Sequence, residues 1–183
     1  MSEELIIKQC SPTLAGIKTA NLFSAYFESK KEMYDKIREL NKRLRNKGLL
    51  VLPLKYESNR GLIYFYRPKY LKKDINCILA KRILDLYGYD VNDTNKCIIH
   101  LIERIGKSDK FPHEIGLFLG YPPEDVKGFI DNKAKNFKAV GTWKVYGNEK
   151  QAKITFNKFK KCTDVYYKQW QSGKMIERLT VAV

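Results

Sequence analysis

Apolar residues recur at three- and four-residue intervals in two long stretches, and this spacing predicts amphipathic helices. The first helix begins with the capping box of Ser29 and Glu32 and ends at Gly48. The second covers about 148–171 and has Asn148 as its cap. Its apolar seam follows a 4-3-4-3-4 spacing, which favours a core-facing helix, and consists of Ala152, Phe156, Phe159, Thr163, Tyr166 and Trp170.

Shorter amphipathic patterns predict two helices in the middle of the chain. The first is capped by Asp74 and ends at Gly88, and the second is capped by Asp93 or Thr94 and ends at Gly106. The expected core positions of the first are Ile75, Ile78, Leu79, Ile83 and Leu86.

A dense apolar and proline-rich stretch, 111–126, predicts a helical corner. One short helix near 112–119 and another near 123–132 flank the tight turn Gly-Tyr-Pro-Pro. The apolar pattern also matches a helix-turn-helix, but Glu124 and Asp125 stand where the recognition helix would meet phosphates. We therefore expect a packed corner in which both acids stabilise the N-terminus of their own helix.

Apolar runs bounded by turn residues predict the strands. The runs 49–56 and 61–67 flank a turn at 57–60 and should pair as a hairpin. Pro53 lacks a backbone donor, so it indicates an edge position or a bulge. Further strands are expected at 19–27, 140–146 and 175–183, with a short lead-in at 3–9 and a turn-rich loop at 10–18.

These elements together predict an α+β fold in which a small, mainly antiparallel sheet is covered by several helices. A chain of 183 residues is typical of one domain, so 1–183 is expected to form a single domain. A weak division falls near residue 68, because most strands precede it and most helices follow it.

The balance of charge favours anionic partners. Lys and Arg number 35 against 20 Asp and Glu, a net charge of +15, which suits a small anionic molecule, a nucleic acid or an acidic protein. Lysine spread over an ordinary solvated surface explains the same excess. No apolar run reaches the roughly 20 residues of a membrane span, so no membrane partner is expected. Acids near the N-terminus oppose a signal peptide, and we expect a cytoplasmic protein.

The thiol of Cys10 and the imidazole of His113 are candidates for a nucleophile and its base, with Glu114 orienting the imidazole. Packed, purely structural roles for all three residues are the alternative. The four cysteines form no C-x-x-C pair and the two histidines stand apart, so no metal site is expected. Nothing in the sequence identifies a cofactor.

Hydroxyl, glycine and lysine residues gather in the loop 10–18, and such a loop can hold an anion with its backbone N–H groups. A tightly packed turn with solvated cations is the alternative. Arg60 and Arg67 near the hairpin would add charge, and Trp143 offers a ring for a flat ligand. The candidate ligand-binding residues are Ser11, Thr13, Lys18, Arg60, Arg67 and Trp143.

Several segments carry a family resemblance. They are 10–23, Tyr66-Arg67-Pro68, 111–122, 124–126 and 143–147, with Cys162 downstream. In this order they resemble the uncharacterised bacterial domain-of-unknown-function family 3793, small proteins of anaerobic Gram-positive bacteria. The resemblance spans nearly the whole chain and implies no activity. It implies only that the Cys10 segment, the His113 helix and the Trp143 strand are motifs of that family.

The sequence thus best supports a cytoplasmic protein that binds a small anionic ligand or cofactor, with or without catalysis. The site would combine the loop 10–18 with the helix in 111–121. Nucleic-acid binding through the basic helix 30–47 or the helical corner is one alternative, and a non-catalytic adaptor for an acidic protein is another.

Overall fold

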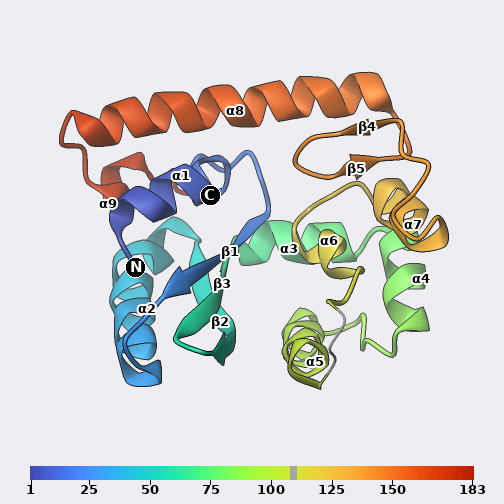
Figure 1. Ribbon diagram of the computed structural model, residues 1–183, viewed down its shortest axis with the longest axis horizontal. Helices are drawn as coiled ribbons and strands as arrows, with labels where there is room; N and C mark the ends of the chain where they lie inside the picture. Colours follow the sequence, from blue (N-terminus) through green and yellow to red (C-terminus); the bar gives the residue numbers. More distant parts are fainter. Residues whose placement is uncertain (108–110) are drawn as a thin grey trace. The chain divides into compact units, whose positions relative to one another are not determined.

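The computed structural model describes residues 1–107 and 111–183, and its elements form the predicted α+β fold (Figure 1). The chain divides into two compact units. The sheet unit comprises Met1–Lys69 and Phe159–Val183, and the helical unit comprises Tyr70–Lys158. Residue 68, where the sequence indicates a weak division, lies beside the first boundary. The return of 159–183 to the first unit is not visible in the sequence.

The sheet unit is built on a three-stranded antiparallel sheet in the order β1-β3-β2. The strands are β1 (Ala20–Tyr26), β2 (Leu50–Glu57) and β3 (Arg60–Tyr66), and the predicted hairpin is confirmed. Ser58 and Asn59 both have positive φ, as a type I′ two-residue hairpin turn requires. Pro53 lies on the edge strand beside a register shift, which confirms both readings of that proline.

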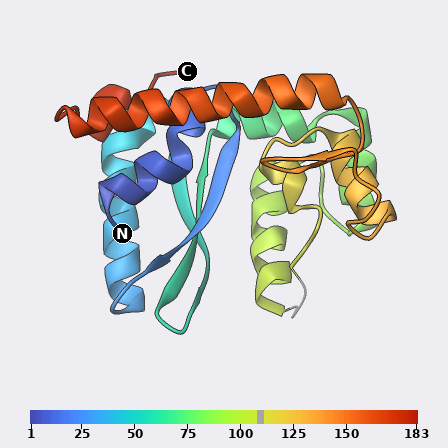
Figure 2. The ribbon, with the colours of Figure 1, turned by 45° about the horizontal axis from the view of Figure 1, so that its top comes forward.

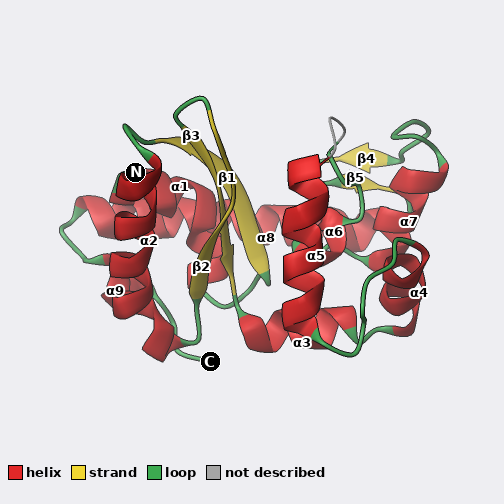
Figure 3. Ribbon diagram, turned by 90° about the horizontal axis from the view of Figure 1, so that it is seen from below, coloured by secondary structure: helices red, strands yellow, loops and turns green. Residues whose placement is uncertain are grey.

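Helices α1 (Glu3–Leu14) and α2 (Lys30–Leu44) cover one face of this sheet (Figure 3). Ser29 caps α2 as predicted, and a short 3₁₀ turn, η1 (Arg45–Lys47), leads to Gly48 at φ +72°. Asn41 of α2 bonds the free edge of β2, because its side chain both accepts from and donates to the backbone of Val51 at 2.8 and 2.9 Å. An edge strand closed in this way offers fewer free groups to other chains.

Two terminal predictions are wrong. The lead-in and the first part of the expected loop, 10–14, form α1, which runs to Leu14 with Pro12 in its last turn, and only 15–18 is a turn. The expected strand 175–183 is instead the short helix α9 (Ile176–Leu179) followed by a tail. Ile176 and Leu179 are both buried in the core cluster, and their three-residue spacing puts them on one helical face. Burial against the sheet therefore decided the local structure at both ends.

The guanidinium of Arg67 joins three segments of the sheet unit, and its side chain is fully buried. Its Nε donates to the Thr13 carbonyl at 2.7 Å, and Nη2 donates to the Leu14 carbonyl at 2.8 Å. Nη2 also donates to the Val181 carbonyl at 2.8 Å, and Nη1 donates to the Lys47 carbonyl at 3.0 Å. Carbonyls at the end of a helix lack hydrogen-bond partners within the helix. The guanidinium therefore supplies donors to the last carbonyls of α1.

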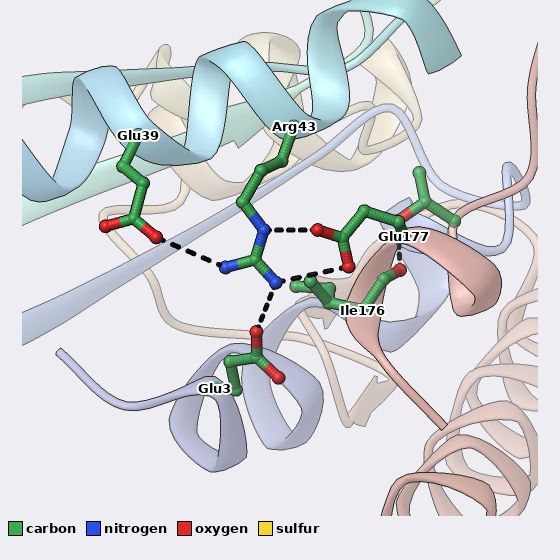
Figure 4. Close-up of polar contacts among 6 residues, drawn as sticks. Glu3, Glu39, Arg43, Ile176 and Glu177 are labelled. Carbon is green, nitrogen blue, oxygen red and sulfur yellow. Dashed lines mark hydrogen bonds and ion pairs between the residues drawn. The ribbon is translucent and has the colours of Figure 1, made fainter. Parts of the chain in front are cut away.

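A second arginine, Arg43 of α2, holds the helices together at the surface (Figure 4). Its Nε and Nη2 donate to both carboxylate oxygens of Glu177 in α9, and Nη2 also reaches Glu3 in α1. Glu39 lies 3.6 Å from Nη1. The hydrogen bonds from Arg43 lower the pKa of the Glu177 carboxyl, with burial acting in the opposite direction.

The helical unit contains α4 (Ile78–Leu86), α5 (Thr94–Lys107), α6 (Ile115–Phe118), α7 (Pro123–Asp131) and the short paired strands β4 (Ala139–Val140) and β5 (Lys144–Val145). Two further helices, α3 (Pro68–Ile75) and α8 (Glu149–Gln171), cross the unit boundaries. The helix predicted at 123–132 and the long helix at 148–171 are confirmed. The single strand expected at 140–146 is instead the end of β4 at Val140, a turn, and the two residues of β5.

The middle helices depart from prediction in their ends. Asp74 lies inside α3, which begins at Pro68, because proline suits the first helical position; α4 then starts after Cys77. Gly106 lies within α5, although Asp93 does cap that helix through the backbone N–H groups of residues 95 and 96. The expected core residues Ile78 and Leu86 are exposed, because α4 buries the face formed by Ala80, Ile83 and Leu84.

We expect Arg67→Lys to lower the free energy of unfolding by roughly 3 kcal/mol. A lysine ammonium carries its donors on one atom, so it cannot reach carbonyls that lie around a planar guanidinium. Urea denaturation measures the loss, and Arg60→Lys in the exposed hairpin is the matched control with an expected change below about 0.5 kcal/mol. Equal stability of the two variants would contradict the structural role of Arg67.

The Arg43–Glu177 pair predicts a pH dependence of stability. Because the folded pKa of Glu177 lies below its unfolded value, its contribution is present above about pH 4.3 and disappears as pH falls through the folded pKa. Glu177→Gln should cost about 1–2 kcal/mol at neutral pH and progressively less in acid. Denaturation curves from neutral to acidic pH test this, with exposed Glu39→Gln as control; a pH-independent difference would refute it.

Candidate functional site

A cavity of about 190 Å³ lies wholly within the helical unit. Its wall comes from the segment before α6, the α6–α7 corner, and the residues at the start of β5. The lining residues are Phe111, Pro112, His113, Ile115, Gly116, Tyr121, Asp125, Val126, Phe129, Trp143 and Lys144. Two residues that the sequence singled out, His113 and Trp143, therefore lie on one cavity.

The helical corner can form this wall because its two helices pack closely. Gly120 has φ +72°, and Pro123 begins α7 after Pro122. A Cβ at Gly116 would lie 2.7 Å from the Val126 side chain, so only glycine permits this approach. The first helix, α6, has only four residues, which is shorter than the predicted 112–119. This packed corner agrees with the reading that placed the apolar pattern in a core.

Asp125 connects the corner to the β4–β5 hairpin, and only 3% of the residue is exposed. Its Oδ1 accepts from the backbone N–H groups of Tyr146 and Gly147, both at 2.7 Å. Its Oδ2 accepts from the indole Nε1 of Trp143 at 2.6 Å. Sequence reasoning assigned Asp125 only to its own helix end. Its position as an acid in the first turn of a helix was the one available signal.

Aromatic rings form much of the wall and hold one another in place. The ring centroids of Tyr121 and Trp143 are 5.0 Å apart at 31°, and Phe156 meets Trp143 edge-on at 4.6 Å. His113 packs edge-on against Phe129 at 5.1 Å. Burial raises the pKa of Tyr121 to about 12, so its phenol is neutral at physiological pH. The indole of Trp143 is thus fixed by Asp125 and by rings on two sides.

Positive charge at this cavity comes from Lys144, which is half-buried. Its Nζ donates to the Ala134 carbonyl at 2.9 Å and lies 4.7 Å from the centroid of the Phe137 ring and 5.9 Å from that of Phe129. His113 is exposed at the cavity, whereas the Asp125 carboxylate already accepts three hydrogen bonds. The cavity therefore presents an ammonium and an imidazole beside apolar rings.

Glu114 faces away from this cavity. It is 1% exposed, and its Oε1 accepts from the Tyr89 hydroxyl at 2.9 Å and from Arg104 Nε at 2.7 Å. Burial, followed by the charge of Glu114, raises the pKa of the Tyr89 phenol. Glu114 thus anchors the start of α6 to α5. Its carboxylate accepts from Tyr89 and Arg104, whereas the sequence suggested that it would orient the imidazole of His113.

Cys10 lies in the middle of α1 and is fully buried. Burial raises the pKa of its thiol strongly, and the nearby charge of Lys18 offsets this only in part. Burial likewise lowers the pKa of Lys18 to about 8. A nucleophilic cysteine needs a depressed pKa, and this environment has the opposite effect. Cys10 belongs to the sheet unit and His113 to the helical unit, so their pairing stays a prediction.

The other proposed anion-binding residues serve the sheet unit. Ser11 Oγ donates to the Ile7 carbonyl within α1, and Thr13 Oγ1 donates to Asn21 Oδ1 at 2.6 Å. Both hydroxyls are buried, as is the guanidinium of Arg67. Arg60 is exposed at the hairpin turn. The expected anion-binding loop is thus a packed helix end, and its side chains are engaged with neighbouring protein groups.

In residues 1–107 and 111–183, no cluster of three or more His, Cys, Asp or Glu side chains is arranged to hold a metal ion. Across those same stretches, every helix is too short or too polar to cross a membrane.

Comparison with known proteins identifies the family. Residues 6–180 match the model of the family described as protein of unknown function DUF3793, and the chain belongs to this family. No curated protein and no solved structure matches the chain. The segments around His113 and Trp143 that carried the sequence resemblance both contribute to the cavity.

We expect Asp125→Asn to destabilise the cavity wall. An asparagine amide can accept from the hairpin N–H groups, but its NH₂ then faces the indole N–H, so two donors meet. The free energy of unfolding should fall by about 1–3 kcal/mol, and the near-ultraviolet circular dichroism of Trp143 should weaken. Glu124→Gln at the exposed neighbouring position is the control. Unchanged stability and dichroism in Asp125→Asn would contradict this assignment.

Proposed function

We propose that the protein binds a small flat molecule carrying one anionic group in the cavity of the helical unit. The observation that carries this proposal is a cavity of about 190 Å³ walled by aromatic rings, with the Lys144 ammonium beside them. Small-molecule sites combine an apolar, concave wall with a few polar groups that orient the ligand. This arrangement fits that description.

The size and shape of the cavity support a ligand of one or two rings. An apolar cavity of about 150 Å³ in another protein accommodates benzene, so about 190 Å³ suits a slightly larger ring system. The faces of Trp143 and Tyr121 are tilted by 31° to each other and offer surfaces for stacking. A flat body gains most from such a wall because rings stack over large areas.

The charge of the cavity supports an anionic group on that ligand. Lys144 is the lysine in the lining, and the negative charge of Asp125 is already compensated by three donors. A carboxylate or phosphate beside Nζ would form a charge-assisted hydrogen bond. The imidazole of His113 would lie beside the same ligand, in a position suited to general acid–base chemistry.

We also propose that the protein works in a reducing, cytoplasmic setting. None of the four cysteines, all of which the structure describes, takes part in a disulfide, and Cys77 is exposed. Disulfides form readily in oxidising compartments, whereas thiols persist where glutathione and thioredoxin keep them reduced.

Ligand binding is tested by titrating the protein with benzoate, indole-3-carboxylate and phenyl phosphate, alongside the neutral analogues indole and phenol. Calorimetry and tryptophan fluorescence report binding, because Trp143 lines the cavity. We expect the anionic compounds to bind more tightly than their neutral analogues. Lys144→Gln should weaken only the anionic compounds, by about 10-fold, since it removes one charge-assisted hydrogen bond.

Lys135→Gln is the matched control, because Lys135 is an exposed lysine of the same unit outside the cavity. Its affinities should equal those of the unmodified protein. Thermal melts of both variants show whether the loss of the Lys144 bond to Ala134 affects folding. The proposal is overturned if no compound binds at millimolar concentration, or if both variants weaken binding equally.

A further inference from the structure

The long helix α8 presents lysines along the face opposite its half-buried seam. Six lysines of this helix are exposed, and they are Lys150, Lys153, Lys158, Lys160, Lys161 and Lys168. Its only exposed acid is Asp164. The opposite face holds the half-buried seam that the sequence predicted, so this lysine face is directed outward. Figure 2 shows α8 as a single unbroken helix.

Few carboxylates in the described part of the chain pair with these lysines. Among the residues that the structure describes, an ion pair reaches only Lys153, which binds Glu149 in the same helix. The basic helix α2 differs, because Lys36, Arg38 and Arg43 are each paired with a carboxylate. Positive charge is therefore less compensated along α8 than along α2.

The spacing of the lysine face matches a linear polyanion. Lys150, Lys161 and Lys168 lie within about 20° of one line along the helix, and 18 residues at 1.5 Å each place the outer two about 27 Å apart. A duplex of that length covers roughly eight base pairs and carries about 16 phosphates. Lys158 and Lys160 flank the line on either side, which suits a backbone that crosses the helix obliquely.

We propose that the lysine face of α8 binds the phosphate backbone of a double-stranded nucleic acid without reading its sequence. Lysine ammonium groups contact phosphates as point charges, and such contacts position a duplex but carry no base information. An amphipathic helix that binds a membrane inserts an apolar face, whereas the apolar face of α8 packs against its own chain. Only Ile154 and Val165 are exposed large apolar residues on α8.

The test measures fluorescence anisotropy of a labelled duplex of about 20 base pairs, titrated with the full chain between about 50 and 300 mM salt. One variant carries Lys150→Gln, Lys158→Gln, Lys161→Gln and Lys168→Gln together. The matched control carries Lys30→Gln, Lys31→Gln, Lys42→Gln and Arg45→Gln on and just after α2, all exposed and without a carboxylate partner among the described residues. Both sets remove four positive charges.

We expect the α8 variant to bind more than about 10-fold more weakly at low salt and to reduce the salt slope of log K by about three to four. The α2 control should reduce that slope by less than about one. Replacing the same four α8 lysines by arginine should preserve both affinity and slope. Circular dichroism melts verify that each variant is folded. If the variant with four glutamines is unfolded, the variant with four arginines still gives a measurement of affinity and salt slope.

Three results would overturn the proposal. One is no anisotropy change with the unmodified protein at the lowest salt, and another is an equal or larger loss in the α2 control. The third is binding to vesicles of mixed phosphatidylserine and phosphatidylcholine without binding to the duplex, which would assign the face to a membrane surface. Failure of ligand binding in the helical cavity would leave this result unaffected, because none of the substituted residues lines that cavity.

Discussion

The sheet unit depends on one buried positive charge. The guanidinium of Arg67 cannot remain in the interior unless its donors are satisfied, since an unpaired buried charge is strongly unfavourable. Its partners are carbonyls from the end of α1, from the turn after α2 and from the tail after α9. All three segments must therefore reach their native positions together. The tail adds a second link there, because the Val181 N–H donates to the Leu14 carbonyl at 2.9 Å.

In the helical unit, Asp125 has the corresponding role with the opposite sign. A buried carboxylate is stable when it accepts several hydrogen bonds, and Asp125 accepts three from one short hairpin. The result is a rigid indole beside the α6–α7 corner, with Gly116 permitting the close packing behind it. A preorganised wall loses little freedom when a ligand binds, which is why rings held in this way suit a binding site.

Several elements were predictable because their signals are local. The cap at Ser29, the hairpin turn at 58–59 and the seam of α8 each depend on residues within a few positions of one another. Pro53 could be assigned to an edge because a residue without a backbone N–H donor is tolerated at few other positions of a sheet. The sequence indicates His113 and Trp143 as candidate residues, yet their shared cavity also needs Tyr121 and Lys144, which lie on separate elements.

The sequence by itself determined the fold class, the long helices, the central hairpin and the excess of positive charge. Only the tertiary structure decided that 10–14 is helical, that 175–183 is no strand, and that Ser11, Thr13 and Arg67 are occupied within the protein. In isolation, small and hydroxyl residues are typical of loops. In the folded chain, the guanidinium of Arg67 donates to the Leu14 carbonyl, 53 residues away in the sequence, and this bond makes a helix end favourable there. Such partners are distant in sequence, so no local pattern could indicate them.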